Sequence, residues 1–340
     1  RTFEEYPGNP LVRHDGRDPK VFWYDPGKHW VMVVYDESQT RELGLDQRAI
    51  LYQHAIYTSP DLKNWTYQSS LPGFFECPEL FEIEVEGEPG VKKWVMYDAS
   101  GEYVVGDFDG KKFTVEQTFR RYDYGGAFYA SQTFNNIPPN DGRRIQIGWI
   151  RSRYYAGMPF SQKMTFPTAL KLQKSFDGYR LTPTPVAEIA SLHRKTHEFG
   201  PQVVTGETKF VSPITGDVLH IVAEIDPGDA PTVGLDINGY RFTYDVFRNT
   251  LNDFNYVPSR ADNLKIEVII DRISIEAFIN DGEMYFVDEL NSVDAERKIE
   301  VFAGGGGARK AILKSLKIHE LASIWDDGAS GAGARVTSRQ

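Results

Sequence analysis

Two short segments contain the side chains with the clearest capacity for chemistry. Asp18 lies between Arg17 and a proline, and the proline disfavours a helix at that position. Glu76 follows two phenylalanines and precedes Cys77 and a second proline. We expect the carboxyl beside a guanidinium to stay ionised. We expect the carboxyl among aromatic side chains to hold its proton, because burial disfavours the charged form.

Such a pair divides the two roles that glycoside hydrolysis requires. One carboxyl protonates the leaving oxygen, and the other keeps a negative charge beside the reacting sugar. The chain has 48 acidic side chains, so pairs of this kind also arise by chance. The alternative interpretation is therefore that both carboxyls cap turns or form surface ion pairs.

Composition excludes several other classes of function. The 340 residues include 38 basic and 48 acidic side chains, for a formal charge of −10, and no basic cluster suited to nucleic acid. No apolar run reaches the roughly 18 residues of a membrane-spanning helix. Cys77 is the single cysteine, and the seven histidines are scattered without ligand spacing, so we expect no disulfide, no metal site and no cofactor.

Short β-strands are predicted to position these residues. Apolar side chains alternate in short runs separated by Gly, Pro, Asp and Asn. Residues 20–24 and 30–35 flank a turn sequence at 25–28, which predicts a hairpin. Residues 57–65, with Asp61 capping a tight turn, resemble the turn that closes strands in the propeller blades of sugar-cleaving enzymes. Further strands are predicted at 51–58, 80–85, 94–99, 103–108, 128–134, 145–150, 169–173 and 179–182.

The predicted organisation is all-β throughout. Residues 1–188 are predicted to form part of a β-propeller and 189–205 a linker, with a short helical turn at 186–192 where the linker begins. Alternating runs between 208 and 320 predict a β-sandwich over residues 206–322. Residues 323–340 are rich in Gly, Ala and Ser and are expected to form a flexible tail.

The ordered motifs resemble those of glycoside hydrolase family 32, whose members cleave β-linked fructose. The resemblance implies a five-bladed β-propeller followed by a β-sandwich, and hydrolysis with retention of configuration. The matching segments are residues 8–10, 17–23, 57–65, 76–81, 123–125, 128–134, 141–144, 147–149, 158–160 and 273–282.

The resemblance also implies roles for individual residues. Glu76 matches the acid/base, and Asp18 matches the stabiliser that binds the ring hydroxyls, with Arg17 nearby. The remaining matches are substrate-binding or pocket residues: Asp123, Cys77, Trp149, Tyr129 and Gln132. For Tyr129 and Gln132, packing in the core is the alternative.

One departure from the family pattern concerns the nucleophile. The family nucleophile lies in a Trp-Met-Asn-Asp-Pro-Asn-Gly segment, and these 340 residues contain none. The nearest imitation, at residues 24–27, is a hairpin turn after the stabiliser motif. We therefore expect the chain to begin inside the propeller and to be completed by an N-terminal fragment that supplies the nucleophile.

These observations predict a retaining hydrolase that releases fructose from levan, inulin or sucrose. Residues 158–167 resemble polymer-cleaving bacterial members, which favours fructan. The alternatives are a five-bladed-propeller glycosidase acting on arabinan or xylan, and a non-catalytic fructan-binding or vestigial protein. Because polymeric fructan does not readily cross a membrane, we expect an extracellular, periplasmic or cell-surface location.

Overall fold

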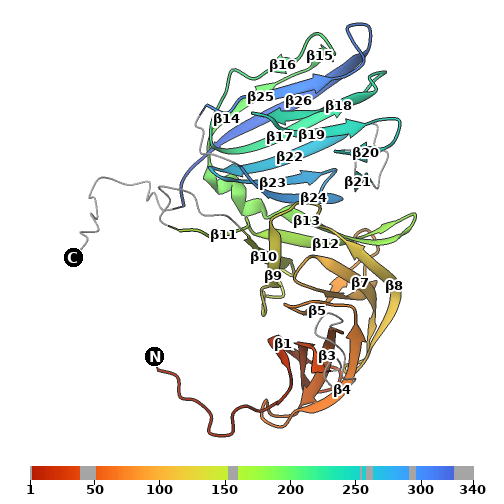
Figure 1. Cartoon of the computed structure of the whole chain (residues 1–340), viewed down its shortest axis with the longest axis vertical. Coiled ribbons are helices and arrows are strands. Elements are labelled where there is room, and N and C mark those ends of the chain that lie inside the picture. The colour runs from red at the N-terminus through yellow and green to blue at the C-terminus, as the bar shows by residue number, and fades with distance from the viewer. Residues whose placement is uncertain are drawn as a thin grey trace, which may run out of the picture.

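A computed structural model describes residues 2–38, 51–151, 160–252, 255–257, 263–290 and 296–324. The regular structure in these ranges is almost entirely β, as the sequence predicts (Figure 1). A 3-10 helix, η2 (Ala187–Leu192), coincides with the predicted helical turn. None of the helices in the described ranges is long and apolar enough to cross a membrane.

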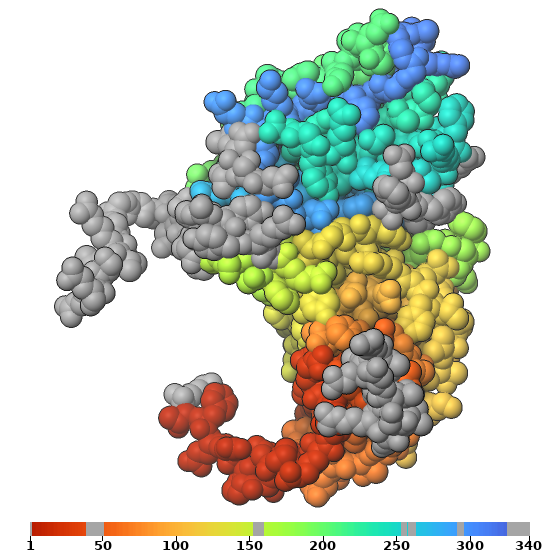
Figure 2. Space-filling view, viewed as in Figure 1, coloured from red at the N-terminus to blue at the C-terminus, as the bar shows by residue number. Residues whose placement is uncertain are grey.

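Three antiparallel sheets precede η2 and follow one another along an arc, whose concave side is open in the space-filling view (Figure 2). The first two are four-stranded meanders of the kind that form propeller blades. The first contains β1 (Gly16–Tyr24), β2 (His29–Asp36), β3 (Gln53–Ser59) and β4 (Thr66–Pro72). The second contains β5 (Glu79–Glu84), β6 (Lys92–Tyr97), β7 (Glu102–Phe108) and β8 (Phe113–Arg121). The third contains β9 (Phe128–Thr133), β10 (Arg144–Ile150), β11 (Lys163–Met164), β12 (Thr168–Ser175) and β13 (Gly178–Pro185).

Two local predictions in the first sheet are confirmed. The turn at residues 25–28 joins β1 to β2, and Tyr24 pairs with His29. After β3, the Asp61 carboxylate accepts hydrogen bonds from the backbone N–H groups of Lys63 at 2.9 Å and Asn64 at 2.8 Å. These backbone donors, that of Asn64 foremost, lower the pKa of Asp61 to about 2. The Asp at this position is therefore a turn cap, as its sequence context indicates.

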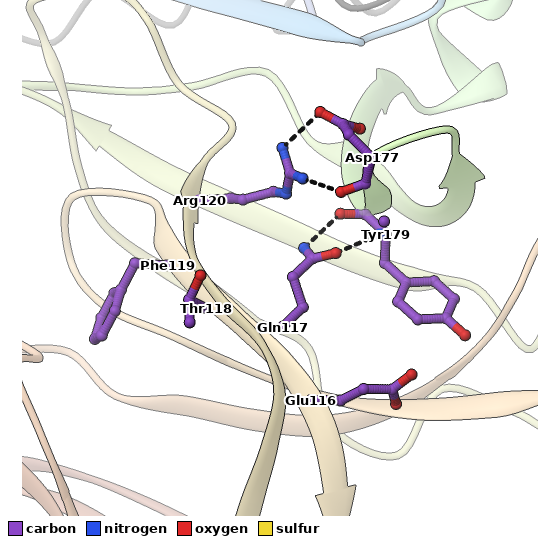
Figure 3. Close-up of a pocket in the computed structure, with 8 residues that line it drawn as sticks. Glu116, Gln117, Thr118, Phe119, Arg120, Asp177 and Tyr179 are labelled. Atoms are coloured by element: carbon purple, nitrogen blue, oxygen red, sulfur yellow. Dashed lines mark hydrogen bonds and ion pairs between the residues drawn. The ribbon is translucent and has the colours of Figure 1, made fainter.

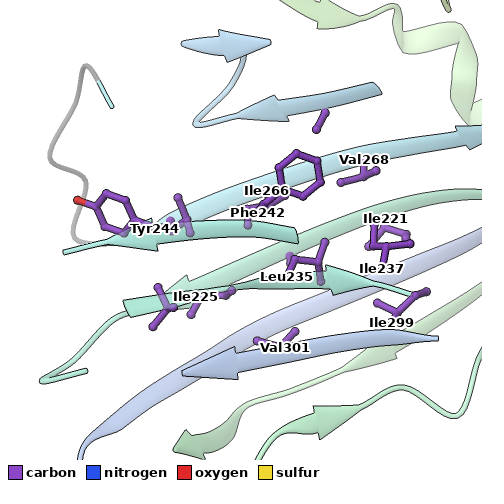
Figure 4. Packing of buried hydrophobic residues seen from close by; sticks show 14 of the residues in the cluster. Ile221, Ile225, Leu235, Ile237, Phe242, Tyr244, Ile266, Val268, Ile299 and Val301 are labelled. Atoms are coloured by element: carbon purple, nitrogen blue, oxygen red, sulfur yellow. The ribbon is translucent and has the colours of Figure 1, made fainter. Parts of the chain in front are cut away.

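The C-terminal part is a sandwich of two antiparallel sheets, as predicted. The seven-stranded sheet contains β14 (His193–Phe199), β15 (Gln202–Thr205), β17 (Val218–Asp226), β22 (Leu264–Asp271), β23 (Ser274–Ile279), β24 (Met284–Glu289) and β26 (Lys310–Leu321). The six-stranded sheet contains β16 (Phe210–Val211), β18 (Thr232–Ile237), β19 (Tyr240–Asp245), β20 (Thr250–Leu251), β21 (Asn255–Tyr256) and β25 (Ile299–Ala303). Between the sheets, Ile221, Leu235, Phe242 and Ile266 are fully buried, so alternation along each strand supplies one continuous core (Figure 4).

The segment predicted as a linker, residues 189–205, is instead part of the sandwich. β14 and β15 lie within it, and both pair with β26. The prediction missed β14 because this edge strand has mostly polar, partly exposed side chains and no alternating apolar pattern. The predicted tail lies almost entirely outside the described residues, as do Met158 and Pro159 of the family-like segment.

The arc of sheets is joined to the seven-stranded sheet at its edge strand, β24. The backbone N–H of Tyr124 donates to the carbonyl of Tyr285 at 2.7 Å, and that of Ala127 donates to the carbonyl of Val287 at 3.0 Å. A Cβ on Gly125 would lie 2.2 Å from the Val287 carbonyl oxygen, so this close approach requires glycine. The two parts therefore share one buried junction.

Candidate active site

Asp18 lies in an irregular stretch at the start of β1. The pairing of β1 with β2 shifts register between Arg17 and Lys20, and Asp18 has a φ of 60°. A side-chain-bearing residue in this conformation costs on the order of 1–3 kcal/mol, so its surroundings must hold it there. Strain of this kind is concentrated at functional sites, which makes Asp18 a candidate independently of any motif.

Glu76 and Cys77 lie in the loop between β4 and β5, and they are strained in the same way. Their φ angles are 35° and 44°. The Asp98 side chain supports this loop by accepting a hydrogen bond from the Phe75 N–H at 3.3 Å. The backbone N–H of Ala99 donates to the Glu76 carbonyl at 3.0 Å. The second sheet therefore fixes the backbone that presents the Glu76 carboxyl.

Cys77 connects the two candidate carboxyls. Its backbone N–H donates to Asp18 Oδ2 at 3.3 Å, and its Sγ lies 3.7 Å from the same oxygen. Burial, together with the carboxylates of Asp18 and Glu76, raises the pKa of the Cys77 thiol to about 12. Cys77 is therefore a neutral thiol at physiological pH and is unsuited to act as a nucleophile.

Arg17 contacts Glu76 and not Asp18, the carboxyl beside it in the sequence. Its Nε and Nη2 lie 2.7 and 2.6 Å from Glu76 Oε1, and its Nη1 lies 3.2 Å from Glu37 Oε1. The guanidinium also lies over the Tyr35 ring, 4.5 Å from its centroid. Arg17 thus contacts Glu76 and Glu37, whereas its neighbour Asp18 contacts Cys77. The expected apolar surroundings of Glu76 are thus replaced by a charged partner.

The second oxygen of Glu76 faces an aromatic wall from the third sheet. It accepts a hydrogen bond from the Tyr129 hydroxyl. Tyr129 pairs across β9 and β10 with Trp149, and their ring centroids lie 5.9 Å apart in an edge-to-face arrangement. Trp149 Nε1 in turn donates to Gln162 Oε1 at 2.7 Å. Three different sheets therefore contribute to the surroundings of one carboxyl.

The structure does not bring Asp123 or Gln132 to this group. Asp123 has 0% of its surface exposed and is bridged to Tyr285 at the junction with the sandwich. Burial raises the pKa of Asp123 to about 8. Gln132 lies farther along β9, exposed and paired with Ile147. A buried junction residue cannot contact a sugar, so the predicted binding role of Asp123 disagrees with its position.

Sequence reasoning missed a buried ionic network beneath the site. Lys20 Nζ lies 2.7 Å from Glu79 Oε1 and 2.7 Å from the Thr133 carbonyl oxygen. The Thr133 hydroxyl donates to the other Glu79 oxygen at 2.6 Å. These residues lie on β1, β5 and β9, so the network fixes the strand that carries Asp18 and the strand that follows the Glu76 loop. The sequence feature that could have predicted this network is Lys20, a charged residue in the otherwise apolar run 20–24.

A hollow of about 510 Å³ lies elsewhere, between β8 and the β12–β13 turn (Figure 3). Within it, Gln117 binds both the backbone N–H and the carbonyl of Tyr179, at 2.5 and 2.7 Å. Arg120 lies 3.2 Å from Asp177 Oδ2. These bonds join the second sheet to the third, and we assign the hollow a structural role.

Comparison with known proteins gives a consistent family match. The model for the glycosyl hydrolases family 32 N-terminal domain matches residues 1–185, and the model for the family's C-terminal region matches residues 188–320. A levanase of Bacillus subtilis (strain 168) is 32% identical in an alignment that is 380 residues long and covers 96% of this chain and 54% of the levanase. An extracellular exo-inulinase of Meyerozyma guilliermondii is 31% identical over 278 residues, which cover 76% of this chain and 50% of the inulinase. The chain thus spans about half the length of these relatives.

The fold has a close counterpart among solved structures. The exo-inulinase from Aspergillus awamori superimposes with a TM-score of 0.75, covering 93% of this chain and 71% of that chain. The sequence identity is 22%, so this likeness concerns the fold alone.

Proposed function

The chain belongs to glycosyl hydrolase family 32, and on that premise we propose that it carries the acid/base and the stabiliser of a retaining β-fructosidase acting on fructan or sucrose. The main support for the proposal is that Asp18 contacts Cys77, the residue next to Glu76 in the sequence. The strained stretch at the start of β1 brings the Asp18 carboxyl to Cys77, the residue that follows Glu76 in the strained loop before β5. Packing alone does not require strain at three side-chain-bearing residues in contact.

Glu76 acts in this proposal as the acid/base. It donates a proton to the glycosidic oxygen as the bond to fructose breaks, and in the second step it accepts a proton from the attacking water. Arg17 and Tyr129 each hold one oxygen of the carboxyl, so they orient it toward the substrate.

Asp18 acts as the stabiliser. Its carboxylate accepts hydrogen bonds from fructosyl hydroxyls, and these bonds strengthen as the ring acquires positive charge in the transition state. The N–H of Cys77 fixes Asp18 Oδ2. Trp149 and Tyr129 supply an amphipathic wall, with apolar ring faces and polar edges, against which a sugar can lie.

The proposal places the nucleophile in a segment outside these 340 residues, since they contain no Asn-Asp-Pro sequence. The names of the relatives support the substrate class, because they are levanases, an extracellular exo-inulinase and invertases. A secreted or surface location follows from the same substrate class, and the extracellular inulinase supports it.

Fructose release by the protein from the complete reading frame tests the proposal. Glu76→Gln keeps the shape of the side chain but removes its proton transfer, so we expect turnover of sucrose or levan to fall by about 10²–10⁴-fold. Glu82→Gln, on an exposed side chain of β5 that pairs with Lys92, is the matched control and should stay within about twofold. A Glu76→Gln protein that folds, as judged by circular dichroism, and hydrolyses sucrose at the parental rate would contradict the assignment. No fructose release by the parent protein would favour a binding role.

A further inference from the structure

Three histidines that are scattered in the sequence meet on the outer face of the seven-stranded sandwich sheet. His193 begins β14, His220 lies in β17 and His319 lies near the end of β26. β26 lies between the other two strands, and His220 pairs directly with His319. Directly paired residues have Cβ atoms about 5 Å apart, so strand register alone brings two of the rings together.

The ring nitrogens are close enough to share one ion. His193 Nε2 lies 3.0 Å from His220 Nδ1, and one nitrogen from each of the three rings lies within 4.8 Å of the others. In a tetrahedral zinc site with bonds of about 2.0–2.1 Å, neighbouring nitrogens are about 3.3 Å apart. The separations of these nitrogens are therefore close to those that three ligands of one ion require.

In two of the three rings, the nitrogen that does not face the cluster has an oxygen partner, as metal-binding histidines usually do. His220 Nε2 lies 2.8 Å from Glu267 Oε1, and His319 Nδ1 lies 2.8 Å from Thr196 Oγ1. Metal-binding histidines usually donate their second N–H to a carboxylate or another oxygen, which fixes the tautomer and the ring orientation. When His220 Nε2 and His319 Nδ1 carry the ring protons, His220 Nδ1 and His319 Nε2 have the lone pairs that can bind a cation.

One rearrangement is needed. The rings of His193 and His319 are stacked, with centroids 3.8 Å apart and planes 8° from parallel. Lone pairs in parallel ring planes do not converge on one ion, so one of these rings must turn out of the stack. Both of these side chains are partly exposed, whereas His220 is buried and contacts Glu267.

We propose that His193, His220 and His319 bind a Zn²⁺ ion, with water as the fourth ligand. Three imidazoles suit zinc and related transition metals, whereas Mg²⁺ and Ca²⁺ prefer oxygen ligands. The site lies where the chain leaves η2 and enters β14, so the ion fastens the first sandwich strand to β26 and β17. Its role is to stabilise the folded protein, because an ion that binds only the folded state raises the melting temperature.

Zinc binding by the purified, chelator-treated protein tests the inference. Titration calorimetry with ZnCl₂ should give one ion per chain with a Kd of about 1 μM or tighter, and saturating zinc should raise Tm. Co²⁺ loading should give the visible absorption of a tetrahedral nitrogen site. His193→Gln and His319→Gln, which both replace partly exposed side chains, should each weaken zinc binding by at least about tenfold.

His197→Gln is the matched control on the same strand. Thr196 pairs with His319 and His197 with Ile318, so His197 points to the opposite face, where it contacts Glu320 at 2.7 Å. This variant should bind zinc as the parent does. Glu76→Gln should also bind zinc normally while losing fructose release, which separates this inference from the proposed function. A parent protein that does not bind zinc at about 100 μM, or a His193→Gln/His319→Gln protein that binds as tightly as the parent, would overturn the inference.

Discussion

The candidate active site and the junction with the sandwich both contain carboxyl groups, but the two regions differ in how far these groups are exposed and in what they contact. At the site, the Glu76 side chain is 20% exposed and contacts a guanidinium at 2.6 Å. At the junction, Asp123 and Glu276 are 0% and 3% exposed, and burial raises their pKa values to about 8 and about 7. The Glu276 oxygens accept hydrogen bonds from the Phe166 N–H at 2.7 Å and the Tyr285 hydroxyl at 2.6 Å.

This contrast teaches that a displaced pKa alone does not identify a catalytic carboxyl. The junction carboxyls have raised pKa values because they are buried, and no substrate can reach them. The site carboxyls are distinguished by access, by strained backbone and by partners from several sheets. Variants in the two regions should therefore affect different quantities.

The largest expected effect is that of Asp18→Asn. The variant keeps the shape and removes the charge that we propose stabilises the transition state, so turnover should fall about a thousandfold or more with a smaller change in KM. Steady-state kinetics on sucrose measure it. Asp25→Asn, which removes an exposed ion pair with Lys28 at the other end of β1, is the control and should stay well within tenfold. A similar loss of turnover in Asp18→Asn and Asp25→Asn would contradict the assignment of Asp18 to the active site.

Asp123→Asn should change stability and its pH dependence. The folded-state pKa of about 8 lies above the ordinary value of 3.8, so folding favours the protonated form. The resulting stability is fully present below about pH 4 and is lost as the pH rises through 8. Between pH 5 and 9 the parent should therefore lose at least about 1 kcal/mol, or roughly 2–4 °C of Tm, relative to the variant. Parallel Tm curves for the two proteins would contradict burial as the cause of the raised pKa.

Tyr129→Phe removes one hydrogen bond to Glu76 and keeps the packing against Trp149. Because the hydroxyl binds the proposed acid/base directly, we expect kcat to fall by about tenfold, the worth of one charge-assisted hydrogen bond. The pH profile of kcat should also change, since the lost donor binds the carboxyl directly. An altered KM with kcat and the pH profile unchanged would instead indicate that Tyr129 contacts only the substrate.

The smallest expected effect is that of Cys77→Ser. A serine hydroxyl replaces a weak 3.7 Å contact to Asp18 and leaves the backbone N–H in place, so activity should stay within about tenfold. The pKa of about 12 also predicts slow alkylation of the native thiol by iodoacetamide at neutral pH, measurable by mass spectrometry. Loss of all activity in a folded Cys77→Ser protein would contradict a packing role.

Much of the fold follows from local patterns, and the missed strands have a common cause. The hairpin between β1 and β2 has a clear turn sequence, and the sandwich strands that line the core, such as β17 and β22, show apolar alternation. β8 and β14 are outer strands with largely exposed polar side chains, so no buried face marks them. Their position is set by pairing with β7 and β26, which lie elsewhere in the chain.

The sequence by itself determined the all-β class, the turn cap at Asp61 and the two motifs that contain Asp18 and Glu76, because these depend on neighbouring residues. Only the tertiary structure decided which groups these side chains meet. In the folded chain, Arg17 pairs with Glu76, and Asp123 is buried at the junction. His193, His220 and His319 lie together on one face of a sheet. The physical reason is strand register: contacts between distant strands depend on how whole sheets align, and no short pattern records that alignment.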